Sequence, residues 1–201
     1  MKQSETKVLS VGILGLGTVG GGTYKVLTRN AEEITRRSGV QIKVIQVADR
    51  NIEHAKANVA AEVAVTDDAF AVVNNPAVDV VVELIGGYTL SKDLVLKAIA
   101  NKKHVVTANK ALIALHGNEI FAAAKANNVM VAYEAAVAGG IPIIKALREG
   151  LAANKIEWVA GIINGTTNFI LTEMREKGLD FADVLGEAQR LGYAEADPTF
   201  D

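Results

Sequence analysis

The chain of 201 residues contains no cysteine, and aromatic residues make up only 5% of it. The absence of cysteine excludes disulfide bonds, thiolate nucleophiles and cysteine-ligated zinc sites. Because 50% of the residues are hydrophobic, the core must be built mainly from Val, Ile, Leu and Ala, which is typical of an α/β protein. The length fits one large domain, or one complete domain with part of another.

The sequence also lacks a long basic run, internal repeats and low-complexity linkers. A formal net charge of -2 argues against a nucleic acid partner. No stretch reaches the roughly 18 uninterrupted apolar residues of a membrane span. The polar start Met1–Lys7 has no apolar core of signal-peptide length. We therefore expect a cytoplasmic protein with no membrane partner.

A glycine-rich turn follows the first apolar run, which covers residues 8–14. Gly15 would allow the tight turn, Gly17 would let the backbone approach a phosphate, and Gly20 would let the following helix pack closely on the strand. Helix N-terminal amides at this point would face the pyrophosphate of a dinucleotide. The alternative is a glycine-rich turn without a ligand. The predicted cofactor-binding residues are Gly15, Leu16, Gly17, Thr18, Val19 and Gly20.

Short Val/Ile runs alternate with Ala-rich stretches along the first two thirds of the chain. This alternation predicts βαβ units and a Rossmann-type doubly wound parallel sheet. The next predicted strands are 40–48, 78–85, 104–107 and 129–133. The predicted helices are 23–37, with Val26, Leu27 and Ile34 facing inward, then 52–63, 68–74, 91–101 capped by Ser91, and 117–128.

The pattern changes at residues 134–142, where small residues and glycines replace the βα repeat. We place a domain boundary there, giving a nucleotide-binding domain at 1–133 and the beginning of a second domain at 134–201. A strand at 158–163 and helices at 169–177 and 181–191 are predicted in the second domain. Asn164 and Thr166 lie in a polar cluster that is either a helix cap or a substrate cradle.

Asp49 and Arg50 end the second predicted strand, where such folds bind the adenosine ribose. An acidic side chain suits the ribose hydroxyls of NAD, whereas a guanidinium suits the 2′-phosphate of NADP. Both are present, so the coenzyme preference stays open, and a capping Asp beside a solvated Arg is the alternative. Asp49 lies 29 residues after Gly20, which requires a long connection through residues 28–39.

Polar or flexible residues also follow two later strands. Gly86 follows the strand at 78–85, and Lys110 follows the strand at 104–107. Ligands in open α/β sheets bind beyond the carboxyl ends of the strands. Gly86 is therefore predicted to lie near the nicotinamide ribose, and Lys110 is a candidate catalytic cation that orients a carbonyl or stabilises an alkoxide.

Taken in order, seven motifs resemble those of homoserine dehydrogenase over essentially the whole chain: GLGTVG, ADR, ELIGG, TANKALIA, YEAAVAGGIPII, GIINGTTNFILTEM and GYAEADP. The resemblance implies NAD(P)H-dependent interconversion of L-aspartate 4-semialdehyde and L-homoserine, in threonine and methionine biosynthesis. It places Lys110 at the cofactor and substrate, Glu195 at the substrate's amino end and Gly192 at the cofactor. It also implies a sodium ion bound by Glu134, Val137, Gly139 and Ile141.

The resemblance further implies a homodimer formed through the second domain. In that family a catalytic aspartate and a proton-donating lysine follow the last motif, and the chain stops before either. We therefore expect an incomplete second α+β catalytic domain, and poor turnover by the 201-residue chain alone. Two alternatives remain: a related two-domain dehydrogenase acting on another amino-acid aldehyde or imine, and a non-catalytic dinucleotide-binding sensor.

Overall fold

The computed structural model describes residues 7–161 and 164–194. The chain divides into two compact units, Met1–Val137 and Ala138–Asp201. Within the described range, no helix combines the length and the hydropathy needed to cross a bilayer.

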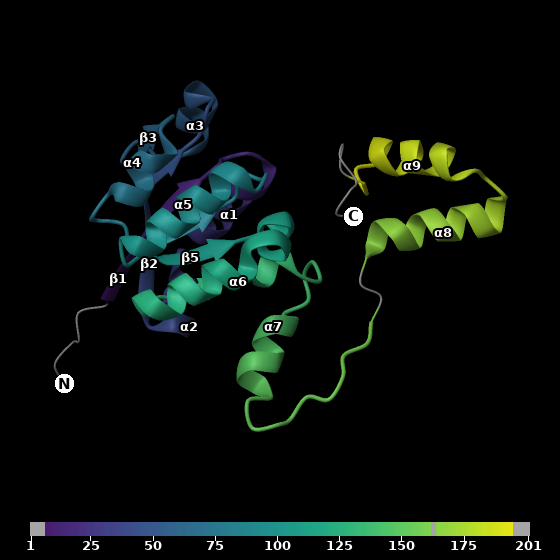
Figure 1. Ribbon diagram of the computed structural model, residues 1–201. Helices are drawn as coiled ribbons and strands as arrows, with labels where there is room; N and C mark the ends of the chain where they lie inside the picture. Colours follow the sequence, from purple (N-terminus) through teal and green to yellow (C-terminus); the bar gives the residue numbers. More distant parts are fainter. Residues whose placement is uncertain (1–6, 162–163, 195–201) are drawn as a thin grey trace. The chain divides into compact units, whose positions relative to one another are not determined.

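The described part of the first unit contains a six-stranded sheet in the order β3-β2-β1-β4-β5-β6 (Figure 1). All neighbouring strands are parallel, so their carboxyl ends share one edge. The chain leaves β1 in one direction for β2 and β3 and returns to its other side with β4, which confirms the predicted Rossmann-type arrangement. The strands are β1 (Lys7–Leu14), β2 (Val40–Ala48), β3 (Ala64–Thr66), β4 (Val80–Glu83), β5 (His104–Thr107) and β6 (Val131–Ala132).

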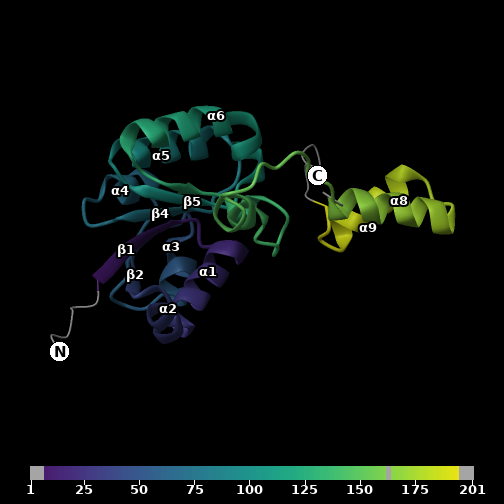
Figure 2. The same cartoon turned by 90° about the horizontal axis from the view of Figure 1, so that it is seen from below.

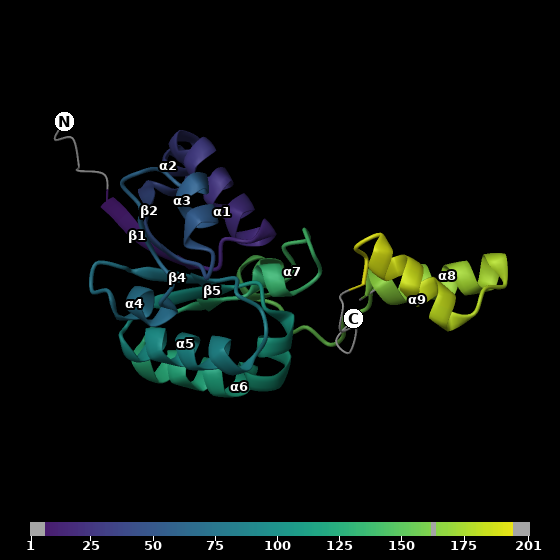
Figure 3. The same cartoon turned by 90° about the horizontal axis from the view of Figure 1, so that it is seen from above.

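Helices cover both faces of the sheet (Figures 2 and 3). The helices α1 (Thr18–Arg29), α2 (Ala31–Ser38) and α3 (Ile52–Asn58) lie on one face, and α4 (Ala69–Asn74), α5 (Thr89–Ala100) and α6 (Lys110–Asn127) lie on the other. Successive residues of β4 feed opposite cores: Val81 packs with the α5 and α6 side, and Val80 and Val82 with the α1 side. Both faces of the strand are therefore buried, as its continuous apolar run predicts.

The chain between Gly20 and β2 forms two helices, and the prediction of one helix at 23–37 is wrong. The chain turns at Asn30, the shared cap of α1 and α2. Val26 was predicted to face inward but is 45% exposed, whereas Tyr24 of the same helix is buried. The hydroxyl of Tyr24 accepts a hydrogen bond of 2.8 Å from the Ala60 amide, so a polar anchor that helical periodicity does not reveal orients α1.

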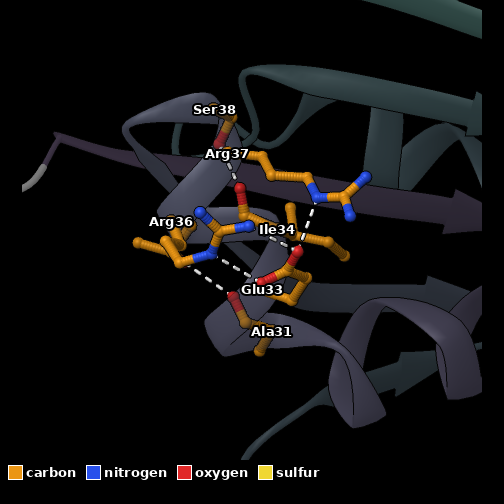
Figure 4. Close-up of polar contacts among 7 residues, drawn as sticks. Ala31, Glu33, Ile34, Arg36, Arg37 and Ser38 are labelled. Atoms are coloured by element: carbon orange, nitrogen blue, oxygen red, sulfur yellow. Dashed lines mark hydrogen bonds and ion pairs between the residues drawn. The ribbon is translucent and has the colours of Figure 1, made fainter.

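An exposed ion-pair cluster stabilises α2 (Figure 4). Glu33 accepts two hydrogen bonds from Arg36, of 2.7 and 2.8 Å, and one of 2.5 Å from Arg37. The bonds from Arg36 and then Arg37 hold the pKa of Glu33 below its ordinary value. Contacts at this helical spacing add modest, salt-sensitive support to a short helix.

We expect this cluster to give the first unit an acid-sensitive helix. A carboxyl with a depressed pKa in the folded state stabilises that state above its unfolded pKa, and the contribution is lost as pH falls through the folded value. An NMR titration of the side chain should place the midpoint of Glu33 below the ordinary value of a glutamate. The midpoint should rise toward that value in 1 M salt, and an ordinary midpoint at low salt would contradict the assignment.

Several other element boundaries differ from the predictions. The short strand β3 was not predicted, and the helix expected at 52–63 ends at Asn58, because the following residues lead into β3. The helix predicted from Gly117 begins at Lys110, seven residues earlier. Ser91 does not cap α5, since Tyr88 is the cap residue and Ser91 is fully buried.

The second unit is largely helical in its described part. Its elements are α7 (Ile143–Lys145), the π-helical turn η2 (Ala146–Gly150), α8 (Gly165–Lys177) and α9 (Phe181–Arg190). Helices α8 and α9 pack through a small core that includes Ile170, Val184 and Ala188. The strand predicted at 158–163 is not formed over its described residues 158–161, and Trp158 is 79% exposed. An apolar run becomes a strand only where another strand pairs with it, and none of the described residues does so.

Candidate cofactor site

The glycine turn joins β1 to α1 at the carboxyl edge of the sheet. Gly15 has a φ of +87°, which side-chain-bearing residues rarely adopt. A Cβ atom on Gly20 would lie 1.9 Å from the carbonyl oxygen of Gly15, so the helix and the turn touch backbone to backbone. At Gly17, a Cβ atom would meet no described atom within 4 Å. Two glycines therefore allow close packing, and the third leaves the open surface that a bound phosphate needs.

The start of α1 presents backbone donors at this surface. Gly17 is the cap residue, no side chain caps the helix, and the Gly21 amide makes the first intrahelical bond, of 2.8 Å to the Gly17 carbonyl. The amides of Thr18, Val19 and Gly20 come earlier and have no carbonyl to bond within the helix. With the positive end of the helix dipole, these three amides form a site suited to an anion.

Asp49 braces the glycine turn from the end of β2. Its carboxylate accepts hydrogen bonds from the amides of Leu16, at 2.7 Å, and Asn51, at 2.8 Å. The Leu16 side chain is 1% exposed and lies in the core. The amide of Leu16 is therefore committed to Asp49, while the neighbouring Arg50 is exposed. The predicted roles of these residues toward a cofactor stay predictions.

The loop after β4 lies against the glycine turn. A Cβ atom on Gly15 would be 2.8 Å from the Leu84 carbonyl oxygen, and the Leu84 amide donates to the Leu14 carbonyl at 2.9 Å. Gly86 and Gly87 have φ values of +81° and +68° and are exposed. The switch between β1 and β4, where ligands of such sheets bind, is thus lined by two glycine-rich loops.

Lys110 is the first residue of α6, and its side chain is half-buried. Asn109 caps the helix: its Oδ1 accepts from the Leu112 amide at 3.0 Å, and its Nδ2 donates to the Gly87 carbonyl at 2.5 Å. The cap therefore ties the start of α6 to the loop after β4. The structure brings Lys110 and Gly86 to the same edge of the sheet, as predicted from their positions after neighbouring strands.

Three polar residues are buried below these loops, and their burial and mutual hydrogen bonds were not expected from the sequence. Glu83, Ser91 and Thr107 are each 0% exposed and are hydrogen-bonded to one another through Glu83. One signal was available, because Glu83 is an ionisable residue at the end of a strongly apolar run. A buried carboxylate is costly unless it is hydrogen-bonded, so such a residue indicates a polar network.

Asn164 and Thr166, two of the residues predicted in the second unit, lie at the start of α8. The Asn164 side chain accepts from the Thr167 amide at 2.6 Å and caps the helix. Thr166 donates to the Tyr193 carbonyl at 2.5 Å, and Gly192 has a φ of +77°. Asn164 therefore caps α8, as one of the two predictions expected. A substrate role for Asn164 and Thr166 stays a prediction. Glu195 lies outside the described residues.

The predicted cation ligands lie on both sides of the boundary between the units. Glu134 belongs to the short 3₁₀ turn η1 (Glu134–Ala136), and its carbonyl accepts from the Val137 amide at 3.2 Å. In the second unit, Gly139 has a φ of +58°, and the Ile141 carbonyl accepts from Ile143 at 2.8 Å. Whether Glu134, Val137, Gly139 and Ile141 bind one cation stays a prediction.

The sheet order, the glycine turn and the uncapped helix start together define a Rossmann-type dinucleotide-binding domain. Residues 15–134 match the family model of the homoserine dehydrogenase NAD binding domain, and residues 142–201 match the homoserine dehydrogenase model. The chain therefore belongs to the homoserine dehydrogenase family.

Individual relatives agree with this assignment. The homoserine dehydrogenase of Pseudomonas aeruginosa is 69% identical over 97% of this chain, which covers 44% of that protein. That of Neisseria gonorrhoeae is 62% identical over 97% of this chain, which covers 45% of it. The chain thus spans less than half of the length of these curated relatives.

Solved structures also match in fold. A homoserine dehydrogenase crystal structure from Thiobacillus denitrificans has a TM-score of 0.88 and 67% identity, covering 97% of this chain and 45% of its own. A hyperthermophilic archaeal homoserine dehydrogenase in complex with NADPH has a TM-score of 0.77 and 28% identity, covering 96% of this chain and 64% of its own.

Proposed function

We propose that this chain supplies the NAD(P)H site and the beginning of the catalytic unit of an enzyme that interconverts L-aspartate 4-semialdehyde and L-homoserine. The observation that carries the proposal is the open helix start at Thr18–Gly20, beside the switch between β1 and β4, in a chain of this family. This reaction would belong to threonine and methionine biosynthesis. A cytoplasmic location and a homodimer of the whole protein are part of the proposal.

The chain's own residues would bind and orient the cofactor. The amides of Thr18, Val19 and Gly20 would donate to the pyrophosphate, above the open surface at Gly17. The exposed loop at Gly86 would border the nicotinamide ribose. When bound, NAD(P)H supplies the hydride that reduces the aldehyde carbon, and NAD(P)+ accepts it in the reverse direction.

Residues from both units would act on the substrate. Lys110 would donate a hydrogen bond to the carbonyl oxygen and stabilise the alkoxide as negative charge develops there. Glu195 would bind the substrate ammonium group, and Asn164 and Thr166 would contribute polar contacts. Gly192 would approach the cofactor. Glu134 and the carbonyls of Val137, Gly139 and Ile141 would hold a sodium ion, consistent with their oxygen donors.

Two observations favour NADPH over NADH. Both oxygens of the Asp49 carboxylate already accept backbone amides, whereas the Arg50 guanidinium is exposed at the same edge. We expect Arg50→Ala to raise the NADPH dissociation constant about tenfold, or about 1.4 kcal/mol, the value of one charge-assisted contact of a solvent-exposed side chain. NADH binding should change less than twofold. Fluorescence titration of the 201-residue chain with each dinucleotide measures both constants.

A matched control removes a cation elsewhere. Lys97→Ala deletes an exposed positive charge on α5, on the opposite face of the sheet. It should leave both dissociation constants unchanged. An equal loss for NADH and NADPH in Arg50→Ala would make Arg50 a general electrostatic contact.

The reaction itself is tested in the whole enzyme. Steady-state oxidation of L-homoserine should far exceed that of other amino alcohols of similar size. Failure of the wild-type chain to bind either dinucleotide, or a clear preference for another amino alcohol, would overturn the proposed function.

A further inference from the structure

A buried carboxylate lies beneath both loops at the cofactor edge, and the proposed reaction does not use it. Glu83 ends β4 and is 0% exposed. In the sheet register it lies between Leu14, which precedes the glycine turn, and Thr107, which is the first residue of the TANK segment, residues 107–110. Since burying an ionisable group is costly without partners, its hydrogen bonds indicate what the residue does.

One oxygen of Glu83 holds the loop after β4. Its Oε1 accepts from the Ile85 amide at 3.0 Å and from the Ser91 hydroxyl at 3.1 Å. The Ser91 hydroxyl also lies 3.0 Å from the carbonyl oxygen of Gly86. The carboxylate and Ser91 therefore fix both the start and the middle of this loop onto the first turns of α5.

The other oxygen holds the start of α6. Its Oε2 accepts from the Thr107 hydroxyl at 2.7 Å, and that hydroxyl accepts from the Asn109 amide at 3.0 Å. The Asn109 side chain reaches back to the Gly87 carbonyl. Hydrogen bonds thus form a closed circuit from Glu83 through Thr107 and Asn109 to the loop after β4.

We infer that Glu83 is a positioning residue whose carboxylate, through Ser91 and Thr107, fixes the loop Ile85–Gly87 and the start of α6 against each other at the nicotinamide end of the cofactor site. The inference rests on the proposed function. Groups that hold a ligand must themselves be held by a second set of contacts. None of the hydrogen bonds described for the circuit involves the glycine turn amides or Arg50, so we expect its effect to fall on the nicotinamide end and much less on the adenosine end.

The test removes one hydroxyl and compares two ligands. Thr107→Val keeps the shape of a buried side chain and deletes the donor to Glu83. We expect the NADPH dissociation constant to rise roughly five- to tenfold, since small displacements of binding groups are costly. Binding of 2′,5′-ADP, which lacks the nicotinamide half, should stay within twofold. Thr107→Ser restores the hydroxyl and should restore NADPH binding.

Two further variants separate positioning from stability. Lys103→Met removes a buried amine that donates to the Asn75 and Val78 carbonyls, before β4 begins. It should lower the melting temperature without changing NADPH binding. Ser91→Ala removes the hydrogen bond from the Ser91 hydroxyl to Glu83 and should weaken NADPH binding as Thr107→Val does. It therefore tests the same inference if Thr107→Val does not fold.

Hydrogen exchange gives a readout that needs no cofactor. Amides of residues 85–88 and 109–112 should exchange faster in Thr107→Val, and those of residues 15–21 should not. Unchanged exchange and unchanged NADPH binding would overturn the inference, as would equal losses for NADPH and 2′,5′-ADP. Absence of NADPH binding by the wild-type chain, with the exchange pattern as expected, would instead refute the proposed function.

Discussion

Replacing Gly20 with alanine is expected to weaken NADPH binding by at least about thirtyfold, the value of one lost charge-assisted hydrogen bond of about 2 kcal/mol. The new Cβ atom would lie 1.9 Å from the Gly15 carbonyl oxygen, a backbone atom that no side-chain rotation can move. The start of α1 and the glycine turn must then separate. The amides of Thr18 and Val19 would move with the helix, away from the pyrophosphate.

The same change should destabilise the first unit by about 1–3 kcal/mol, the usual cost of forcing extra atoms into a packed contact. Calorimetric titration with NADPH and thermal unfolding measure the two effects. Wild-type affinity in Gly20→Ala would show that the cofactor does not use the start of α1, which would also remove the main support for the proposed function.

Gly22→Ala provides the matched control two residues later in the same helix. Its Cβ atom would meet no described atom within 4 Å. Alanine is favoured over glycine in a helix by about 0.5–1 kcal/mol, so this variant should be slightly more stable than the wild type. Its NADPH affinity should be unchanged. Opposite effects from one chemical change in one helix would assign the loss in Gly20→Ala to the contact with Gly15.

The glycine turn was predictable because each of its requirements is local. A buried strand, a positive φ at Gly15 and a close helix contact at Gly20 all fall within a few residues of one another. Strand β2 was predicted with its observed limits for the same reason, since its apolar run is bounded by Gly39 and Asp49.

The circuit around Glu83 could not be predicted in this way. Its partners Ser91 and Thr107 are 8 and 24 residues away and meet the carboxylate only through the packing of α5 and the register of β5. The predicted strand that is not formed over the described residues 158–161 shows the converse. Its apolar residues favour a strand, but strand formation depends on a pairing partner that a local pattern does not reveal.

Lys110→Met is expected to separate stability from catalysis in the whole enzyme. Lys110 occupies the first position of α6, where a positive charge opposes the helix dipole. Lysine and methionine have similar helix propensities, so the variant should still fold and α6 should still form. Homoserine oxidation should nevertheless fall by about two to three orders of magnitude, as when one group that stabilises a developing oxyanion is removed.

Lys125→Met is the matched control, because it removes a lysine from the last turn of the same helix, where the charge is favourable. It should lose about 0.3–1 kcal/mol of stability and keep wild-type turnover. Thermal unfolding and steady-state kinetics on both variants complete the comparison. Normal turnover in Lys110→Met would remove the lysine from the reaction, and a stability loss there like that in Lys125→Met would give it a structural role. If Lys110 is needed for turnover although its charge opposes the helix dipole, the start of α6 serves the reaction and not the stability of the helix.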